Sequence, residues 1–177
     1  MEEEQPQKPE PTPPQQNRFK EGKTATLICT IITILALLTL ILGFLWKNPY
    51  LIIAGIFPAA IYEAWRTEGF FTKIASVGIV ILVILEILAI LGIFQINLAQ
   101  IFQQEGAYLQ GYYLPLGDVR FVFPAIVVIL ALVLLFRTYG KYTKWLSVVI
   151  LINSVGLLYL VNKQVLVEII RNFLYFI

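Results

Sequence analysis

The chain has 177 residues, of which 59% are hydrophobic and 14% are charged, and its net charge is +2. A soluble domain is usually close to half apolar with about a quarter of its residues charged, so this composition excludes an ordinary soluble domain. The small net charge argues against nucleic-acid binding. The chain has no His, which removes imidazole ligands and the commonest general base, and Cys29 is its only Cys. We therefore expect no cofactor, metal site or intramolecular disulfide.

Residues 1–22 are expected to form a disordered cytoplasmic tail. The segment is rich in Gln and Glu and contains Pro6, Pro9, Pro11, Pro13 and Pro14. Such a composition cannot bury a core and favours extended polyproline II conformations. The segment is too long and too acidic for the first part of a signal peptide. We interpret it as a solvated tail that precedes a membrane bundle over residues 23–163.

Five apolar runs in that bundle are predicted to cross the membrane as helices. A helix needs roughly 20 predominantly apolar residues to cross about 30 Å of hydrocarbon. The predicted spans are Thr24–Trp46, Tyr50–Trp65, Lys73–Ile96, Arg120–Phe136 and Tyr142–Asn162. The sequence thus predicts an all-α integral membrane protein with about five transmembrane helices.

Polar residues at the first two spans suggest how these helices pack. One face of the first span carries Thr26, Thr30 and Thr33. We interpret this stripe as helix-packing contacts rather than the lining of a pathway. Lys47, Asn48 and Pro49 are expected to form a short turn, because Pro disfavours a helical residue before it. Glu63 and Arg66 lie three residues apart at the end of the second span, so they can pair on one face of that helix.

Two further segments are expected at the membrane–water interface. The longest connection, residues 97–119, contains Tyr108, Tyr112 and Tyr113 among Gln and Gly. Aromatic and nearly uncharged loops are typical of that interface. Residues 164–177 carry polar residues on one side of a helix and apolar residues on the other. This pattern predicts a C-terminal amphipathic helix that lies in the interface or packs against the bundle.

The distribution of Lys and Arg predicts the orientation. With the N-terminus inside, nine cations lie on the cytoplasmic side: Lys8, Arg18, Lys20, Lys23, Arg66, Lys73, Arg137, Lys141 and Lys144. Four lie on the other side: Lys47, Arg120, Lys163 and Arg171. The positive-inside rule therefore favours a cytoplasmic N-terminus, an outer C-terminus and a location in a cell or inner membrane.

Two of the predicted cytoplasmic loops resemble each other. The loop at Arg66 reads R-T-E-G-F-F-T-K-I-A-S-V, and the loop at Arg137 reads R-T-Y-G-K-Y-T-K-W-L-S-V. Seven of the twelve positions match: Arg, Thr, Gly, Thr, Lys, Ser and Val. Convergence is one explanation, because any inner hairpin favours such residues. A duplicated two-helix hairpin explains the neutral Ser and Val matches better, and predicts a parallel repeat of spans two and three with spans four and five.

Each matched residue type has a physical role at such a loop. The cations that bracket the two loops are Arg66, Lys73, Arg137 and Lys144. Gly69 and Gly140 are expected to supply a turn with positive φ. Thr72 and Thr143 are expected to cap the helices that follow.

Glu86 lies near the middle of the third span. An acid at that depth costs about 2.5–3.5 kcal/mol on insertion scales. Asn153 lies at the same depth in the fifth span, so we predict a buried polar pair that joins the two helices. The alternative is a proton-carrying or cation-binding acid in a transport path. Leu157 matches Glu86 in the second loop copy, which argues against a symmetric transport site.

The sequence contains no recognised catalytic motif. An intramembrane enzyme would have to use Glu86 or Asp118 without His. We expect a non-enzymatic protein with a structural or accessory role, which acts in the lipid bilayer as a homo-oligomer or beside other membrane subunits. The alternative function is a small proton- or cation-coupled carrier that uses Glu86.

Overall fold

The structure, a computed structural model, describes residues 15–93, 107–109, 112–114, 119–163, 167 and 171. The described residues form five helices: α1 (Gln15–Trp46), α2 (Pro49–Arg66), α3 (Phe70–Ile90), α5 (Val119–Arg137) and α6 (Lys141–Val161). Between α3 and α5, β1 (Ala107–Leu109) pairs antiparallel with β2 (Tyr112–Leu114), so that Tyr108 lies opposite Tyr113. Apart from this short pairing the described fold is helical, as predicted.

Four of the five helices are long and apolar enough to cross a membrane. They cover Gly22–Trp46, Phe70–Ile90, Arg120–Arg137 and Lys141–Val161. The remaining helix, α2, has 18 residues and carries Glu63, Arg66 and Pro58. These residues lower its hydropathy relative to the other four.

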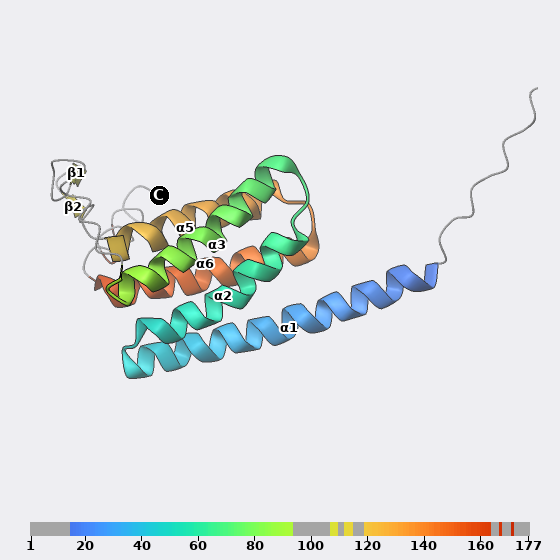
Figure 1. Cartoon of the computed structure of the whole chain (residues 1–177), viewed down its shortest axis with the longest axis horizontal. Coiled ribbons are helices and arrows are strands. Elements are labelled where there is room, and N and C mark those ends of the chain that lie inside the picture. The colour runs from blue at the N-terminus through green and yellow to red at the C-terminus, as the bar shows by residue number, and fades with distance from the viewer. Residues whose placement is uncertain are drawn as a thin grey trace, which may run out of the picture.

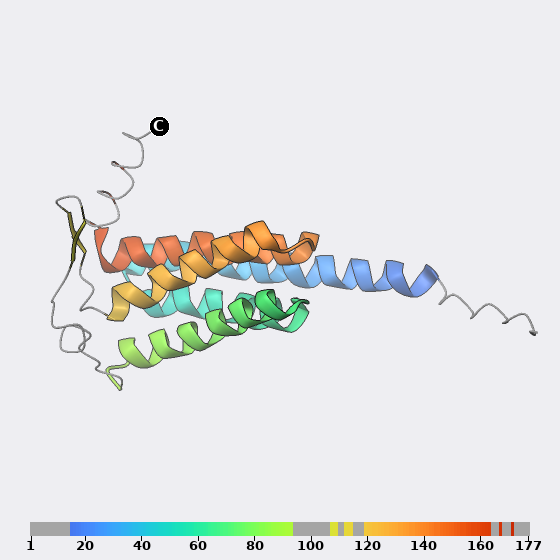
Figure 2. The ribbon, with the colours of Figure 1, turned by 90° about the horizontal axis from the view of Figure 1, so that it is seen from above.

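Consecutive helices run antiparallel along one bundle (Figures 1 and 2). Contacts join α2 to α3, α3 to α5, α5 to α6 and α6 back to α2, so these four helices close a ring. Helix α1 packs outside the ring, against α2 and α6. Figure 2 shows the start of α1 and the loops α2–α3 and α5–α6 at the same end of the bundle.

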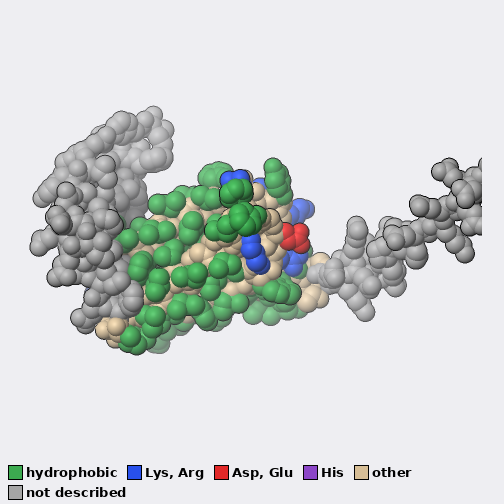
Figure 3. Space-filling model, turned by 45° about the horizontal axis from the view of Figure 1, so that its top comes forward, with side chains coloured by type: hydrophobic (Ala, Val, Ile, Leu, Met, Phe, Trp, Pro, Cys, Tyr) green, Lys and Arg blue, Asp and Glu red, His purple; other side chains and the backbone are tan. Residues whose placement is uncertain are grey.

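Close packing holds α1 against α2. A Cβ added to Gly55 in α2 would lie 2.0 Å from Oγ1 of Thr39 and 3.1 Å from Cα of Ala36 in α1. Only a residue without a side chain fits there. The outer faces remain apolar, with exposed residues such as Leu27 and Ile31 in α1. Figure 3 shows hydrophobic side chains over the body of the bundle and basic side chains near one end, a distribution suited to lipid contact.

The predicted helix bounds agree closely for three elements. Helices α2, α5 and α6 differ from the predicted spans by one residue at each end. The predicted turn before α2 is confirmed, because Oδ1 of Asn48 accepts a hydrogen bond from the Tyr50 amide at 3.0 Å and Pro49 begins the helix.

Helices α1 and α3 differ more from the prediction, and α3 begins at Phe70 rather than at Lys73. Helix α1 begins at Gln15, inside the segment predicted to be disordered, and residues 1–14 lie outside the described residues. Helix α3 ends at Ile90, earlier than the predicted Ile96, and Gly92 follows with a φ of 73°. The predicted C-terminal amphipathic helix also lies outside the described residues, except that Val167 and Arg171 have helical backbone.

Candidate functional site

The two similar loops lie together at one end of the bundle (Figure 2). Thr67–Gly69 joins α2 to α3, and Thr138–Gly140 joins α5 to α6. In the repeat, α2 matches α5 and α3 matches α6. The contact between α2 and α6 therefore has an equivalent in the contact between α5 and α3. The site is therefore built around two matching loops.

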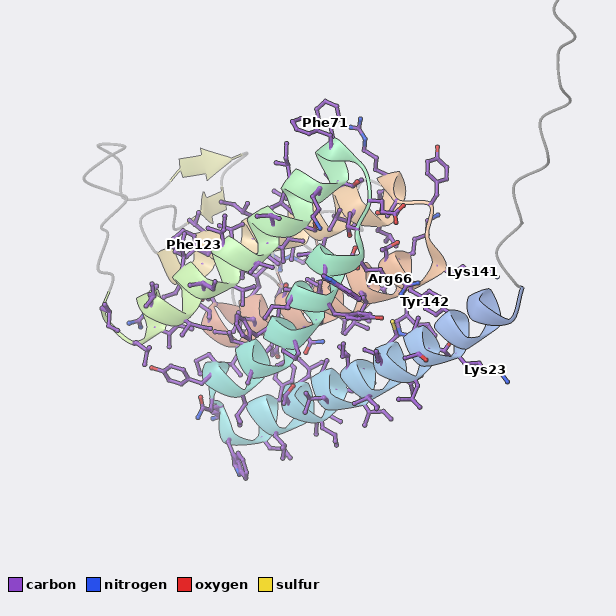
Figure 4. All side chains as sticks on the ribbon, turned by 45° about the vertical axis from the view of Figure 1, so that its right-hand side comes forward. Lys23, Arg66, Phe71, Phe123, Lys141 and Tyr142 are labelled. Carbon is purple, nitrogen blue, oxygen red and sulfur yellow. The ribbon has the colours of Figure 1, made fainter. Side chains whose placement is uncertain are left out.

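The Arg that precedes each loop lies over an aromatic ring that follows the other loop. The guanidinium carbon of Arg66 lies 4.7 Å from the centre of the Tyr142 ring, and that of Arg137 lies 4.9 Å from the centre of the Phe71 ring. Arg66 matches Arg137 in the repeat, and Phe71 matches Tyr142. Figure 4 shows Arg66 beside Tyr142 on the side that faces α1. The contacts are thus crossed between the copies, and each is a cation–π interaction.

Helix α1 contacts the aromatic ring of only one of these two pairs. The Tyr142 hydroxyl donates to the Gly22 carbonyl at 3.0 Å and lies 2.8 Å from Oγ1 of Thr26. Phe71 has no hydroxyl and is 65% exposed. The Arg137–Phe71 contact is therefore the open member of the pair.

The Thr stripe of α1 faces α6 in part. Besides the Thr26 contact, Nε1 of Trp145 donates to Oγ1 of Thr33 at 2.9 Å. The hydroxyl of Thr30 donates to the Thr26 carbonyl in its own helix. These bonds support the interpretation of the stripe as helix packing.

The predicted roles of the loop Gly and Thr residues hold only in part. Gly69 has a φ of 98°, as predicted, whereas Gly140 has a φ of −72° in extended backbone. Thr72 and Thr143 lie inside the first turn of α3 and α6, and their hydroxyls donate back to the Gly69 and Gly140 carbonyls at 3.0 and 2.8 Å. The capping prediction was wrong because the Gly residue, and not the Thr, precedes each helix.

Glu63 is a buried acid that the sequence pattern did not reveal. Its side chain is fully buried, and Oε1 accepts hydrogen bonds from Oγ1 of Thr67 at 3.2 Å and from Oγ of Ser147 at 3.4 Å. Oε2 has no hydrogen-bond partner among the described residues. The predicted pairing with Arg66 was wrong, since Arg66 instead reaches Tyr142 and the Tyr62 hydroxyl.

The predicted pair of Glu86 and Asn153 lies deeper in the bundle. Both side chains are buried. The Asn153 amide donates to the Val149 carbonyl of its own helix at 2.8 Å. Glu86 lines a void of about 10 Å³ together with Ser154 and Pro124. The direct contact between Glu86 and Asn153 remains a prediction.

An open cavity of about 1280 Å³ lies between the two loops. Arg66 and Arg137 both line it, and Glu68 is the only acid in its described lining. Among the aromatic residues of its described lining, Trp65, Phe70, Phe71, Phe136 and Tyr139 are well exposed, whereas Tyr62 and Tyr142 are partly buried. Of the other predicted loop cations, Lys144 is exposed, and Lys73 donates to the Ala64 carbonyl, which ties the start of α3 to the end of α2.

No family model, curated protein or solved structure matches the chain. Within the described ranges, no group of three or more His, Cys, Asp or Glu side chains could hold a metal ion. The repeat-loop cavity and the two buried glutamates are therefore the features on which a function can be argued.

Proposed function

We propose that the chain is a five-span membrane protein with a structural or accessory role in a membrane complex. Helix α2 is the fifth span in this proposal. At 1.5 Å per residue its 18 residues extend about 27 Å, close to the hydrocarbon thickness. It contacts α1, α3 and α6, and these three helices shield the face that carries Glu63. A shielded span tolerates a residue such as Glu63 better than a lipid-facing one does.

A duplicated hairpin and a cytoplasmic N-terminus complete the proposed arrangement. The matching loops, the crossed Arg contacts and the equivalent helix contacts all support duplication about an axis along the bundle. The loop end carries Lys23, Arg66, Lys73, Arg137, Lys141 and Lys144. This excess of cations supports a cytoplasmic location for that end.

Side-chain hydrogen bonds between helices support the structural role. Trp145 of α6 donates to Thr33 of α1, and Ser147 of α6 donates to Glu63 of α2. Such bonds hold neighbouring helices together. We infer that the bundle serves as a stable body and that its function depends on what it binds.

Isolation of the full chain from its native membrane in mild detergent tests this role. We expect a tagged chain at native expression levels to elute as a homo-oligomer or with other membrane subunits. The same preparation in a harsh detergent is the control and should release a single chain. A monomer without companions in the mild detergent would contradict the proposal.

The carrier alternative depends on Glu86. The burial of this acid beside a void favours the carrier function. The volume of the void, about 10 Å³, is however only enough for a single water. Glu86→Gln keeps hydrogen bonding and removes titration. If the reconstituted wild type carried a proton or cation flux that Glu86→Gln lost, the carrier function would replace the structural one.

A further inference from the structure

We propose that the repeat-loop cavity binds the phosphate headgroup of an anionic phospholipid. The proposal rests on the five-span arrangement above, because that arrangement brings the cavity to the cytoplasmic surface of the bilayer. Its ligand chemistry is a phosphate diester attached to an apolar body. Three properties of the cavity carry the inference: its cations, its apolar wall and its open side.

Two guanidinium groups supply the charge. Arg66 and Arg137 both line the cavity, whereas Glu68 is the only acid in its described lining. Stacking on Tyr142 and Phe71 holds each guanidinium against a ring face. The N–H groups of a guanidinium point outward in its own plane, so a stacked Arg can still bind two phosphate oxygens at once.

Further positive charge lies at the same end of the bundle. Lys23 and Lys141 directly precede lining residues of α1 and α6, and both are exposed at this end of the bundle (Figure 4). The first turns of α3 and α6 also line the cavity, and neither helix has a side-chain N-cap. Their amide groups add partial positive charge to a site that the arginines already make cationic.

The apolar wall distinguishes a lipid from free phosphate. Trp65, Phe70 and Phe136 line the cavity and are 75%, 75% and 82% exposed. A free phosphate ion would fill a small part of about 1280 Å³ and leave these rings in water. The glycerol and upper acyl segments of a phospholipid would cover them, and aromatic side chains are enriched at that depth of the bilayer.

The two arginines are not equivalent in this site. Arg66 is partly buried, and the hydroxyl of its ring partner Tyr142 is hydrogen-bonded to α1. Arg137 is exposed, and so is its ring partner Phe71. We therefore assign Arg137 as the principal phosphate ligand and Arg66 as the second.

The fluorescence of Trp65 can report the binding of lipid in the cavity. Its three Trp residues are Trp46, Trp65 and Trp145, and only Trp65 lines the cavity. In a Trp46→Phe, Trp145→Phe background, the full-length protein would be placed in phosphatidylcholine bilayers. Bromine-labelled phosphatidylglycerol or bromine-labelled phosphatidylcholine would then be added at the same low fraction, and quenching of Trp65 fluorescence measured.

We expect Trp65 to be quenched by the anionic lipid with an apparent affinity about tenfold higher than by the neutral lipid. Both lipids carry the phosphate diester, but the two guanidinium groups repel the choline cation of the neutral lipid. Arg137→Gln should remove most of this preference and Arg66→Gln less of it. Lys163→Gln, which removes a cation outside the lining, is the matched control and should keep it. Arg137→Lys retains the charge without the planar group and should give an intermediate preference.

The outcomes separate the two proposals. Equal quenching by both lipids would overturn the lipid site and leave the five-span arrangement standing. Quenching by neither lipid would overturn both, since Trp65 would then not lie at the bilayer. A preference that soluble glycerol phosphate abolishes at equal concentration would show a free phosphate site and overturn the lipid assignment. If Arg137→Gln and Arg137→Lys both kept the full preference while remaining folded by circular dichroism, the assignment of Arg137 would be wrong.

Discussion

The guanidinium of Arg66 lies 4.7 Å from the ring centre of Tyr142, so that a cation of the first loop rests on an aromatic ring of the second. The reverse contact, from the second loop to the first, is 4.9 Å long. The Arg of each copy thus contacts the aromatic residue of the other copy. The end of the bundle is therefore held by two contacts of the same kind, related by the exchange of the hairpins.

The open contact can be measured by a double-mutant cycle. We expect Arg137→Gln and Phe71→Leu to be coupled by about 0.5–1 kcal/mol, the range for an exposed cation–π pair. The measurement is unfolding of the single and double variants by sodium dodecyl sulfate in mixed micelles. Additive effects of the two changes would mean that the pair contributes no stability.

Tyr142→Phe should destabilise the bundle through the loss of its contacts with α1. The ring under Arg66 remains, but the hydrogen bond to the Gly22 carbonyl and the contact with Thr26 are lost. A loss of about 0.6–1.5 kcal/mol is expected on unfolding in micelles. The matched control is Phe71→Tyr, which should gain no stability because no described helix takes the place of α1 there. A gain at Phe71 equal to the loss at Tyr142 would contradict this asymmetry.

Glu63→Leu should be tolerated, because the matching residue of the second copy is the fully buried Leu134. Both donors to Glu63 keep backbone acceptors: Thr67 donates to the carbonyl of residue 63, and Ser147 donates to that of Thr143. A buried oxygen without a partner costs about 1–3 kcal/mol, so the free energy of unfolding should stay unchanged or rise.

The control for that change is Glu63→Ala, which leaves a cavity and should cost about 2–4 kcal/mol. If Leu and Ala destabilised the bundle equally, the acid itself would be needed for stability. If Leu were stable but the protein lost its activity or its partners, Glu63 would be retained for function.

Gly55→Ala should separate α1 from α2. The added Cβ would lie 3.1 Å from Cα of Ala36 and closer still to Thr39, so a backbone must shift. A destabilisation of about 1–3 kcal/mol is expected from such overpacking. Gly78→Ala is the matched control, since its Cβ would meet only the end of the Leu130 side chain at 3.4 Å. Equal stability of the two variants would argue against a close contact between α1 and α2.

The helices and the matching loops were predictable because each depends on neighbouring residues. Pro49 after Asn48, and Gly69 between Arg66 and Lys73, mark helix ends by local conformation alone. The crossed contacts were not predictable in the same way. A repeat indicates that two loops are alike, but only their packing decides that each Arg reaches the other loop.

Glu63 illustrates the same limit. It lies one turn before the end of α2, beside Trp65 and Arg66, where an acid normally faces water. Its burial results from α1, α3 and α6, which surround α2. Glu86 was recognisable because apolar residues flank it on both sides in its own helix. Its neighbours across the bundle were not predictable, because they come from other helices. Ser154 of α6 and Pro124 of α5 line the void beside Glu86.

Labelling with a membrane-impermeant maleimide tests the proposed arrangement most directly. In a Cys29→Ala background, single cysteines would be placed at Glu68, Tyr139 and Lys163, all exposed. Glu68→Cys and Tyr139→Cys should both be protected in intact cells and labelled after the membrane is opened, whereas Lys163→Cys should be labelled in intact cells. Labelling of Glu68→Cys and Tyr139→Cys from opposite sides of the membrane would contradict the five-span bundle and the shared loop site.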